Sequence, residues 1–331
     1  MSVKSSVVVI TGASSGIGRA TALRFAKKGA SVVLASRRET ALQELAVRCQ
    51  ELGGSALAVP TDVSDAAAVQ ALADAAIRKF GRIDVWVNNA AISVYSPFLE
   101  MPLDDLRRVL DVNILGYVYG ARAALLEMTK EGRGSLINVA SIVGEIPQPY
   151  TAAYGMSKAA VRALGVSLRS ELWLAKQKRI KVSTVLPATI DTRFFQHSAN
   201  YTGRKVVAMP PVYPAELVAK AIVDLVKDPK DEVTVGALGK TMVKQHRAAP
   251  GPLEAQMAVQ VERTHLSRTE PVAANPGTIY EPAADPADAT VSGGWHGASR
   301  TARRVVVGPL LLAGGGALAW RALGRRGAKR S

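Results

Sequence analysis

The chain has 331 residues, 48% hydrophobic and 21% charged, which excludes a disordered protein and allows one α/β domain of about 200–250 residues plus an extension. Its net charge of +15 includes eight basic and no acidic residues in the segment 300–331, so the charge forms a local tail and argues against a nucleic-acid-binding body. One cysteine, Cys49, excludes an internal disulfide, and the N-terminus lacks the apolar run of a signal peptide, so we expect a cytoplasmic protein.

Short β-branched runs alternate with longer helical patterns over the first two-thirds of the chain. The predicted strands are Val7–Thr11, Ser31–Ala35, Ala56–Val59, Ile83–Asn88, Ser135–Ala140, Lys181–Leu186 and Glu232–Val235. The predicted helices are Gly16–Lys28, Glu39–Leu52, Asp65–Phe80, Leu103–Lys130, Tyr154–Lys176 and Pro214–Lys227. Strands and helices of these lengths form parallel βαβ units. We therefore predict a doubly wound parallel sheet of about seven strands, with ligands bound at the carboxyl ends of the strands.

The alternation stops near residue 240, so we assign residues 1–240 to the α/β domain. Residues 241–266 are predicted as a partly helical extension, and residues 267–299 have the Pro/Ala/Gly-rich composition of a linker. Residues 300–331 form a basic apolar tail. Its uncharged run, Val305–Trp320, is about 24 Å long as a helix, short of the ~30 Å core of a bilayer. Membrane association of residues 305–320 and docking on protein are equal alternatives.

A glycine-rich loop closes the first predicted strand and opens the first helix. Its glycines permit a tight turn and a close approach to a pyrophosphate, which the free N–H groups of the helix attract. The candidate cofactor-binding residues are Gly12, Ser14, Ser15, Gly16, Ile17 and Gly18. With its G-x-x-x-G-x-G spacing in strand–turn–helix context, this region resembles the short-chain dehydrogenase/reductase family, which implies a Rossmann-type domain over roughly residues 5–240.

In such a fold, residues at the end of the second strand bind the cofactor's ribose. An acidic residue there binds the 2′-hydroxyl of NAD, whereas this chain has Arg37 and Arg38, which suit a 2′-phosphate. We therefore predict NADP(H) as the cofactor; the alternative is that both arginines are merely solvated. The resemblance also implies that Asp62 and Val63 contact the adenine. A turn-starting role for Asp62 is an equal alternative.

The sequence Asn88-Asn89-Ala90-Ala91 differs from the family's Asn-Asn-Ala-Gly at its last residue. By resemblance, Asn89 and Ala90 border the cofactor. Pro187, Ile190 and Thr192 follow the sixth strand, where the family places its nicotinamide contacts.

Tyr154 and Lys158 have the i, i+4 spacing that puts two side chains on one helix face. A lysine charge there favours the tyrosinate, lowers its pKa and fits the phenol for proton transfer. Tyr201 and Lys205 repeat this spacing, so the motif alone is weak. Thirteen residues before Tyr154 stands Ser141, whereas the residue thirteen before Tyr201 has no hydroxyl, so we take the second copy as chance.

The resemblance implies a role for each member of a catalytic tetrad. Tyr154 is the acid/base, Lys158 lowers its pKa and binds the nicotinamide ribose, Ser141 polarises the carbonyl, and Asn113 completes a proton relay. The segment Arg193–Pro211 takes the position of the family's substrate loop. Its aromatic residues suggest a lid over a lipophilic substrate; lid packing or a subunit contact is equally open.

We therefore predict an NADP(H)-dependent oxidoreductase that transfers hydride between nicotinamide and a lipophilic carbonyl or secondary alcohol. No histidine spacing indicates a metal. A homo-oligomer is expected from the resemblance. The alternatives are a cofactor-binding scaffold or sensor without turnover, and a membrane-surface or interaction protein driven by the tail.

Overall fold

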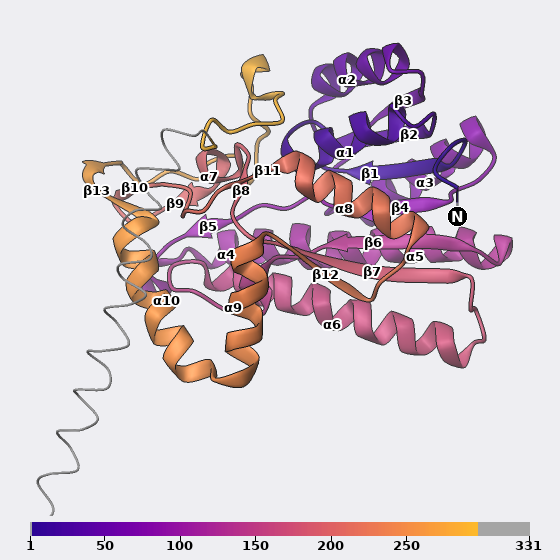
Figure 1. Cartoon of the computed structure of the whole chain (residues 1–331). Coiled ribbons are helices and arrows are strands. Elements are labelled where there is room, and N and C mark those ends of the chain that lie inside the picture. The colour runs from indigo at the N-terminus through magenta and orange to yellow at the C-terminus, as the bar shows by residue number, and fades with distance from the viewer. Residues whose placement is uncertain (1, 297–331) are drawn as a thin grey trace, which may run out of the picture.

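A seven-stranded parallel sheet lies at the centre of the computed structural model, which describes residues 2–296 (Figure 1). The strand order is β3-β2-β1-β4-β6-β7-β12, which confirms the predicted doubly wound sheet. Its strands are β1 (Val7–Thr11), β2 (Ser31–Ser36), β3 (Ser55–Pro60), β4 (Val85–Asn88), β6 (Gly134–Val139), β7 (Ile180–Pro187) and β12 (Glu232–Val235). The central strands β1, β4 and β6 are buried at every position, as expected when helices cover both faces.

Helices cover the sheet in two layers. One layer consists of α1 (Gly16–Ala26), α2 (Glu39–Glu51) and α8 (Ala215–Lys227). The other consists of α3 (Ala66–Phe80), α5 (Gly116–Glu131) and α6 (Ala152–Leu174). Each layer buries its own apolar cluster against one face of the sheet, so the strand ends are held between two packed faces.

The helix predicted over Leu103–Lys130 is interrupted. The structure has α4 (Leu103–Leu110), a π-helical turn η2 (Asp111–Leu115) and then α5. A π-turn adds one residue to a turn and reorients the side chains after it, which periodicity alone does not reveal. By length and hydropathy the whole run 103–131 could span a membrane, but half of its most apolar window is buried inside the fold, as in a core helix.

The smaller elements lie at the carboxyl edge of the sheet. They are β5 (Val94–Tyr95) paired with β9 (Ala199–Asn200), β8 (Ile190–Asp191) paired with β11 (Tyr213–Pro214), η1 (Phe98–Glu100), η3 (Ile142–Gly144) and α7 (Phe194–His197). After β12 the chain forms α9 (Ala237–Ala248), which crosses the predicted boundary at residue 240, and α10 (Pro250–Thr264). The strand β13 (Leu266–Pro271) pairs antiparallel with β10 (Arg204–Val206). Leu253, Met257 and Val261 of α10 pack on Ile142 and Ile146.

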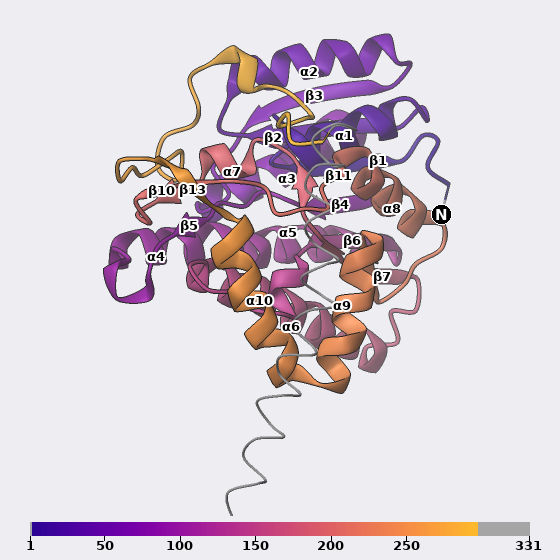
Figure 2. The ribbon, with the colours of Figure 1, turned by 60° about the vertical axis from the view of Figure 1, so that its left-hand side comes forward.

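The segment predicted as a linker, 267–299, contains β13 and a short 3-10 helix η4 (Pro286–Asp288). From β13 the chain passes back toward the N-terminal half, where it lies above α1 and β2 (Figure 2). Ile279 in this stretch is fully buried among residues of β5, α4 and α6. The tail proposed for membrane contact, including residues 305–320, lies outside the described residues.

Candidate active site

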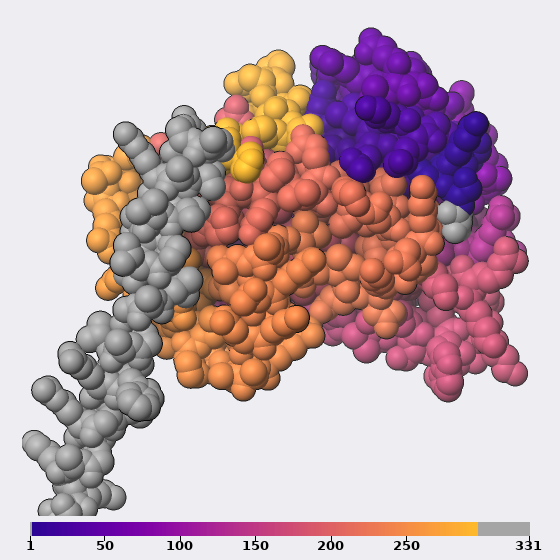
Figure 3. Space-filling view, in the orientation of Figure 1, coloured from indigo at the N-terminus to yellow at the C-terminus, as the bar shows by residue number. Residues whose placement is uncertain are grey.

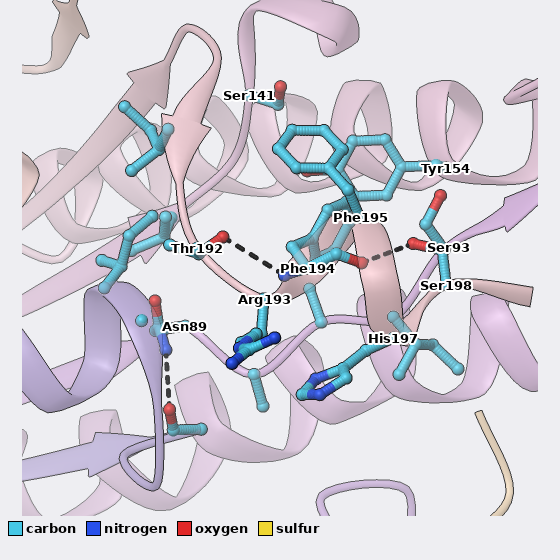
Figure 4. A pocket seen from close by; sticks show the side chains of 18 of the residues that line it. Asn89, Ser93, Ser141, Tyr154, Thr192, Arg193, Phe194, Phe195, His197 and Ser198 are labelled. Carbon is cyan, nitrogen blue, oxygen red and sulfur yellow. Dashed lines mark hydrogen bonds between the residues drawn. The ribbon is translucent and has the colours of Figure 1, made fainter. Parts of the chain in front are cut away.

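A cavity of about 290 Å³ opens at the carboxyl ends of the strands. It brings together nearly all of the predicted site residues, from Gly12 in the glycine loop to Thr192 after β7. Those that line it are Gly12, Ser14, Ser15, Gly16, Ile17, Arg37, Arg38, Asp62, Val63, Asn89, Ala90, Ser141, Tyr154, Lys158, Pro187, Ile190 and Thr192. Figure 4 shows part of this lining, with Tyr154 and Ser141 on one side and Asn89 on the other. Gly18 and Asn113 are the two predicted residues that do not line it.

The glycine loop packs tightly against the end of β4. A Cβ at Gly18 would lie 2.2 Å from the Gly12 carbonyl oxygen, and one at Gly12 would lie 2.8 Å from Ala90 Cα, so neither position has room for a side chain. Asn89 Nδ2 donates to the carbonyl oxygens of Thr11 (2.9 Å) and Gly12 (3.3 Å). The loop is thereby held with the first turn of α1 at the cavity, as binding a pyrophosphate there requires.

Arg38 lies between the loop and the end of β2. Its Nε donates to Ser14 Oγ at 3.3 Å, and its main-chain N–H donates to Ser36 Oγ at 3.2 Å. Ser36 ends the strand, so a hydroxyl and not a carboxylate stands at the position where the sequence predicts the ribose contact. A guanidinium and two hydroxyls form a donor set that fits a phosphate.

Arg37 has different partners. Its guanidinium donates to the main-chain oxygens of Thr278 (2.8 Å) and Tyr280, from the segment that follows β13. No motif in the sequence indicated that this segment lies at the cavity. Arg37 therefore holds the C-terminal stretch in place, whereas Arg38 contacts both Ser14 of the glycine loop and the main-chain oxygen of Asp288 in that stretch.

Asp62 is ion-paired, with its Oδ2 2.8 Å from Arg108 Nη2. Burial acts to raise the pKa of Asp62, but hydrogen bonds from Arg108 and Ser64 outweigh it, and the pKa lies below its usual value. The carboxylate is thus charged and held by Arg108 at the cavity wall. Val63 beside it packs closely on α5, because a Cβ at Gly116 would lie 3.0 Å from its side chain.

Tyr154 and Lys158 face the cavity from α6, in the arrangement that the i, i+4 spacing predicts. Burial raises the pKa of the Tyr154 phenol to about 12, although its hydrogen bond with Ser141 acts to lower it. Burial also lowers the pKa of Lys158 to about 7. The sequence-based expectation of a lowered tyrosine pKa thus differs from the structure, because desolvation penalises both charges and Lys158 Nζ lies 5.6 Å from the Tyr154 ring centroid.

Lys158 is anchored away from the phenol. Its Nζ donates to the Val139 carbonyl oxygen at 2.9 Å and to Tyr117 Oη at 3.0 Å. Tyr117 Oη in turn donates to the same carbonyl at 2.8 Å. Sequence reasoning missed Tyr117, although its position four residues after Asn113 was a usable signal for a shared helix face.

Asn113 lies fully buried in the π-turn and acts on the main chain. Its Oδ1 accepts from Ile92 N, and its Nδ2 donates to the Ile92 carbonyl, both at 2.9 Å. Nδ2 also donates to Ser157 Oγ at 3.0 Å. This side chain ties the strand end after β4 to α6, and so fixes the distance between the glycine loop side and the Tyr154 side of the cavity.

The second Tyr-x-x-x-Lys pair lies apart from the cavity lining. Tyr201 Oη donates to Asp105 Oδ2 at 2.5 Å, and Lys205 in β10 pairs with Glu270 at 2.7 Å. The two residues are not on a common helix, so their i, i+4 spacing does not place their side chains on one face.

Aromatic side chains line the outer half of the cavity. Phe194 packs on Tyr154, with ring centroids 5.3 Å apart, and Phe195 packs on His265 at 5.7 Å. His265 Nδ1 donates to the Val207 carbonyl, so Nε2 accepts from Tyr95 Oη at 3.1 Å. Burial lowers the pKa of His265 to about 4, so this histidine is neutral at pH 7.

Ser93 is a further polar residue on this side, and its buried hydroxyl has no hydrogen-bond partner among the described residues. Tyr95 and His265 are 170 positions apart in the sequence, and Ser93 belongs to no motif. Nothing short of the fold could have placed these three residues at one cavity.

Comparisons with known proteins agree with this geometry. The family model described as short chain dehydrogenase matches residues 6–202. An uncharacterized oxidoreductase of Bacillus subtilis is 39% identical over 72% of this chain and 67% of its own length. The 3beta-hydroxysteroid dehydrogenase 1 of Eggerthella lenta is 36% identical over 70% of this chain and 90% of its own length.

A solved structure shares the architecture as well. A short chain dehydrogenase/reductase from Burkholderia phymatum, in complex with NAD, superimposes with a TM-score of 0.70 at 27% identity, covering 82% of this chain and 99% of that one. The chain belongs to the short-chain dehydrogenase/reductase family and is an oxidoreductase of that family, which confirms the resemblance inferred from the sequence.

Proposed function

We propose that this protein is an NADP(H)-dependent oxidoreductase that interconverts a carbonyl group and a secondary alcohol on a lipophilic substrate. The observation that carries the proposal is one continuous cavity that joins the glycine loop and Arg38 to Ser141, Tyr154 and Lys158. The tight seat of the loop at the start of α1 fits a dinucleotide pyrophosphate.

When bound, the nicotinamide supplies or accepts the hydride. The chain's own residues handle the proton and the polarity of the substrate oxygen. The Tyr154 phenol, with a pKa of about 12, is protonated at neutral pH and is therefore set to donate to the substrate oxygen during reduction. The Ser141 hydroxyl, hydrogen-bonded to that phenol, supplies a second donor to the same oxygen. Lys158 lends positive charge when protonated, which stabilises the tyrosinate left after the transfer.

The preference for NADP(H) rests on Arg38 and, to a lesser extent, Arg37. Arg38 contacts the hydroxyls of Ser14 and Ser36, and Ser36 stands at the end of β2, where an NAD-binding fold has its acidic residue. The Burkholderia structure contains NAD, so the comparisons do not decide between NAD(H) and NADP(H). The preference for NADP(H) is therefore argued from these two arginines.

The lipophilic substrate is inferred from the outer half of the cavity. Phe194, Phe195, Met209 and Met257 line it, and such a surface favours a bulky apolar body. The similarity to a relative named as a hydroxysteroid dehydrogenase supports the same class. A homo-oligomer stays an expectation from the family resemblance.

The proposal is tested by titrating the purified full-length protein with NADPH and NADH, followed by nicotinamide fluorescence. We expect NADPH to bind at least about tenfold more tightly, because a 2′-phosphate gains charge-assisted hydrogen bonds. Replacing Arg37 and Arg38 together by Gln should weaken NADPH far more than NADH. The matched control is Arg107→Gln, since Arg107 is exposed on α4.

Turnover is tested in the same preparations with a panel of apolar secondary alcohols and ketones. Tyr154→Phe should keep cofactor affinity and lose at least about 100-fold in kcat, because it removes the proton donor. Equal losses of NADPH and NADH in the arginine variant would discard NADP preference, and binding without turnover in the wild type would favour a scaffold.

A further inference from the structure

An acidic side chain from the C-terminal stretch contacts residues that line the cavity near the glycine loop. Asp288, at the end of η4, places Oδ1 3.5 Å from Arg193 Nε and Oδ2 3.2 Å from His197 Nε2. Its main-chain oxygen accepts from Arg38 Nη2 at 3.2 Å. Arg38, Arg193 and His197 all line the cavity, so a cluster suited to an anion is already facing a carboxylate of the chain itself.

The same stretch reaches the start of α1. The Thr290 carbonyl oxygen accepts from Gly16 N at 2.8 Å. Gly16 is the first residue of α1, and N–H groups in a first helical turn are the groups that bind an anion at a helix start. A main-chain oxygen thus occupies one of the donors that a pyrophosphate needs.

A buried carboxylate holds the end of this stretch. Asp191 in β8 accepts from Gly293 N (3.0 Å), Trp295 N (2.7 Å) and Ser292 Oγ (2.6 Å). Trp295 also packs edge-on against Phe195, with ring centroids 5.9 Å apart. Residues 281–296, here called the C-terminal arm, are therefore docked at both the phosphate end and the substrate end of the cavity.

The arm is attached mainly through polar contacts. Residues 284–287 are exposed, and its apolar contacts with the body come from half-buried side chains such as Val291 and Trp295. The chain before it is fixed, because Ile279 is fully buried and its carbonyl accepts from Arg108. Figure 3 shows the arm, in yellow, on the surface against the indigo N-terminal half. The arm can therefore lift from a pivot near Tyr280 without exposing a core.

We propose that the C-terminal arm competes with the phosphates of the dinucleotide for Gly16, Arg38 and Arg193, so that arm docking and cofactor binding exclude each other. The inference rests on the proposed function, since it takes a dinucleotide as the ligand. Asp288 is the internal anion in this competition. The three hydrogen bonds that Asp191 accepts from the arm set how strongly the arm is held. The arm thereby lowers the apparent cofactor affinity by the fraction of molecules in which it is docked.

The test uses hydrogen exchange of the full-length protein with and without saturating NADPH. Cofactor binding should protect the glycine loop and, at the same time, speed exchange at Gly293 and Trp295, whose N–H groups Asp191 holds. A second experiment measures the NADPH affinity of Asp288→Asn, a substitution that removes the charge with little change in shape. We expect at least fivefold tighter binding. The control is Asp285→Asn, the same charge change on the same arm at an exposed carboxylate, which should stay within twofold.

The outcomes separate the two proposals. Protection of the glycine loop with unchanged or slower exchange in the arm would mean that the arm covers the bound cofactor, which overturns the competition and leaves the proposed function standing. Unchanged or weaker NADPH binding in Asp288→Asn would overturn it as well. If neither the wild type nor Asp288→Asn binds NADPH or NADH, the proposed function fails and this inference fails with it.

Discussion

Lys158 is a charged group in a place where a charge is costly. It is 1% exposed, its Nζ donates to one carbonyl and one phenol, and within residues 2–296 no carboxylate is among its hydrogen-bond partners. Burial lowers its pKa from 10.5 to about 7. Between these two values the unfolded chain binds a proton that the folded chain does not, so the stability contributed at this site rises with pH from about 7 to 10. Below pH 7 the full penalty is present.

We therefore expect Lys158→Met to be more stable than the wild type at pH 7. The gain should be on the order of 1–3 kcal/mol, less than the pKa difference alone implies, because two hydrogen bonds are lost. The advantage should shrink by roughly 2 kcal/mol between pH 7 and pH 9. Urea unfolding at both pH values measures this, with exposed Lys178→Met as the control. A variant that is less stable at pH 7 would show that the hydrogen bonds outweigh desolvation.

Sequence reasoning was strong for residues that carry chemistry at fixed spacing. Tyr154, Lys158 and Ser141 line one cavity as their spacing and strand-end position predicted. It could not predict the pKa values, because these depend on burial that the whole fold creates. His265 shows the same limit, since its neutrality and its partner Tyr95 both follow from tertiary packing.

At the scale of elements, a polar network sits where α5 crosses the middle of the sheet. Trp86 Nε1 donates to Asn88 Oδ1 at 2.8 Å, and Asn88 Nδ2 donates to Asn138 Oδ1 at 3.0 Å. Gly120 of α5 lies directly over it, because a Cβ there would be 2.2 Å from Asn88 Oδ1 and 2.8 Å from Trp86 Nε1. The close approach of helix and strand at this point depends on the missing side chain.

Gly120→Ala should therefore destabilise the protein by about 2–3 kcal/mol, although Ala is the better helix former by about 1 kcal/mol. The matched control is Gly251→Ala in α10, where an added Cβ meets nothing within 4 Å and the propensity gain should leave stability unchanged or slightly raised. Urea midpoints of the two variants decide the matter. Similar midpoints would mean that the network relaxes around the methyl group.

The seven strands of the sheet could be predicted because each is a short apolar run between helical patterns, and all seven overlap the observed ones. The break in the helix at Asp111–Leu115 could not, since a π-turn adds a residue without an obvious change in composition. The two-residue strands β5, β8, β9 and β11 were also beyond reach. They are too short for periodicity and exist only because distant segments meet at the cavity.

At the scale of the whole molecule, the C-terminal stretch links regions that are far apart in sequence. Its composition predicted a linker, and composition was uninformative because the contacts are single main-chain and carboxylate bonds with no repeating pattern. Asp191 and Arg37 bind segments about 100 and 240 residues away. Such contacts couple the stability of the fold to whatever binds in the cavity.

The coupling predicts how cofactor and arm together set thermal stability. A Cβ at Gly293 would lie 2.1 Å from the Thr192 carbonyl oxygen, so Gly293→Ala should unseat the arm with little effect on the sheet. Without cofactor, the variant should melt at a lower temperature than the wild type, because the hydrogen bonds from the arm to Asp191 are lost.

With NADPH at one fixed concentration, the melting temperature of Gly293→Ala should rise by more than that of the wild type. A ligand that binds the folded state stabilises it by RT ln(1 + [L]/Kd), so a tenfold tighter Kd in Gly293→Ala adds about 1.4 kcal/mol. For a fold of this size that is an extra rise in Tm of roughly 2–3 °C over the rise in the wild type. Gly251→Ala should show the wild-type increment. A smaller increment in Gly293→Ala would place the docked arm in the cofactor-bound protein and contradict the competition between them.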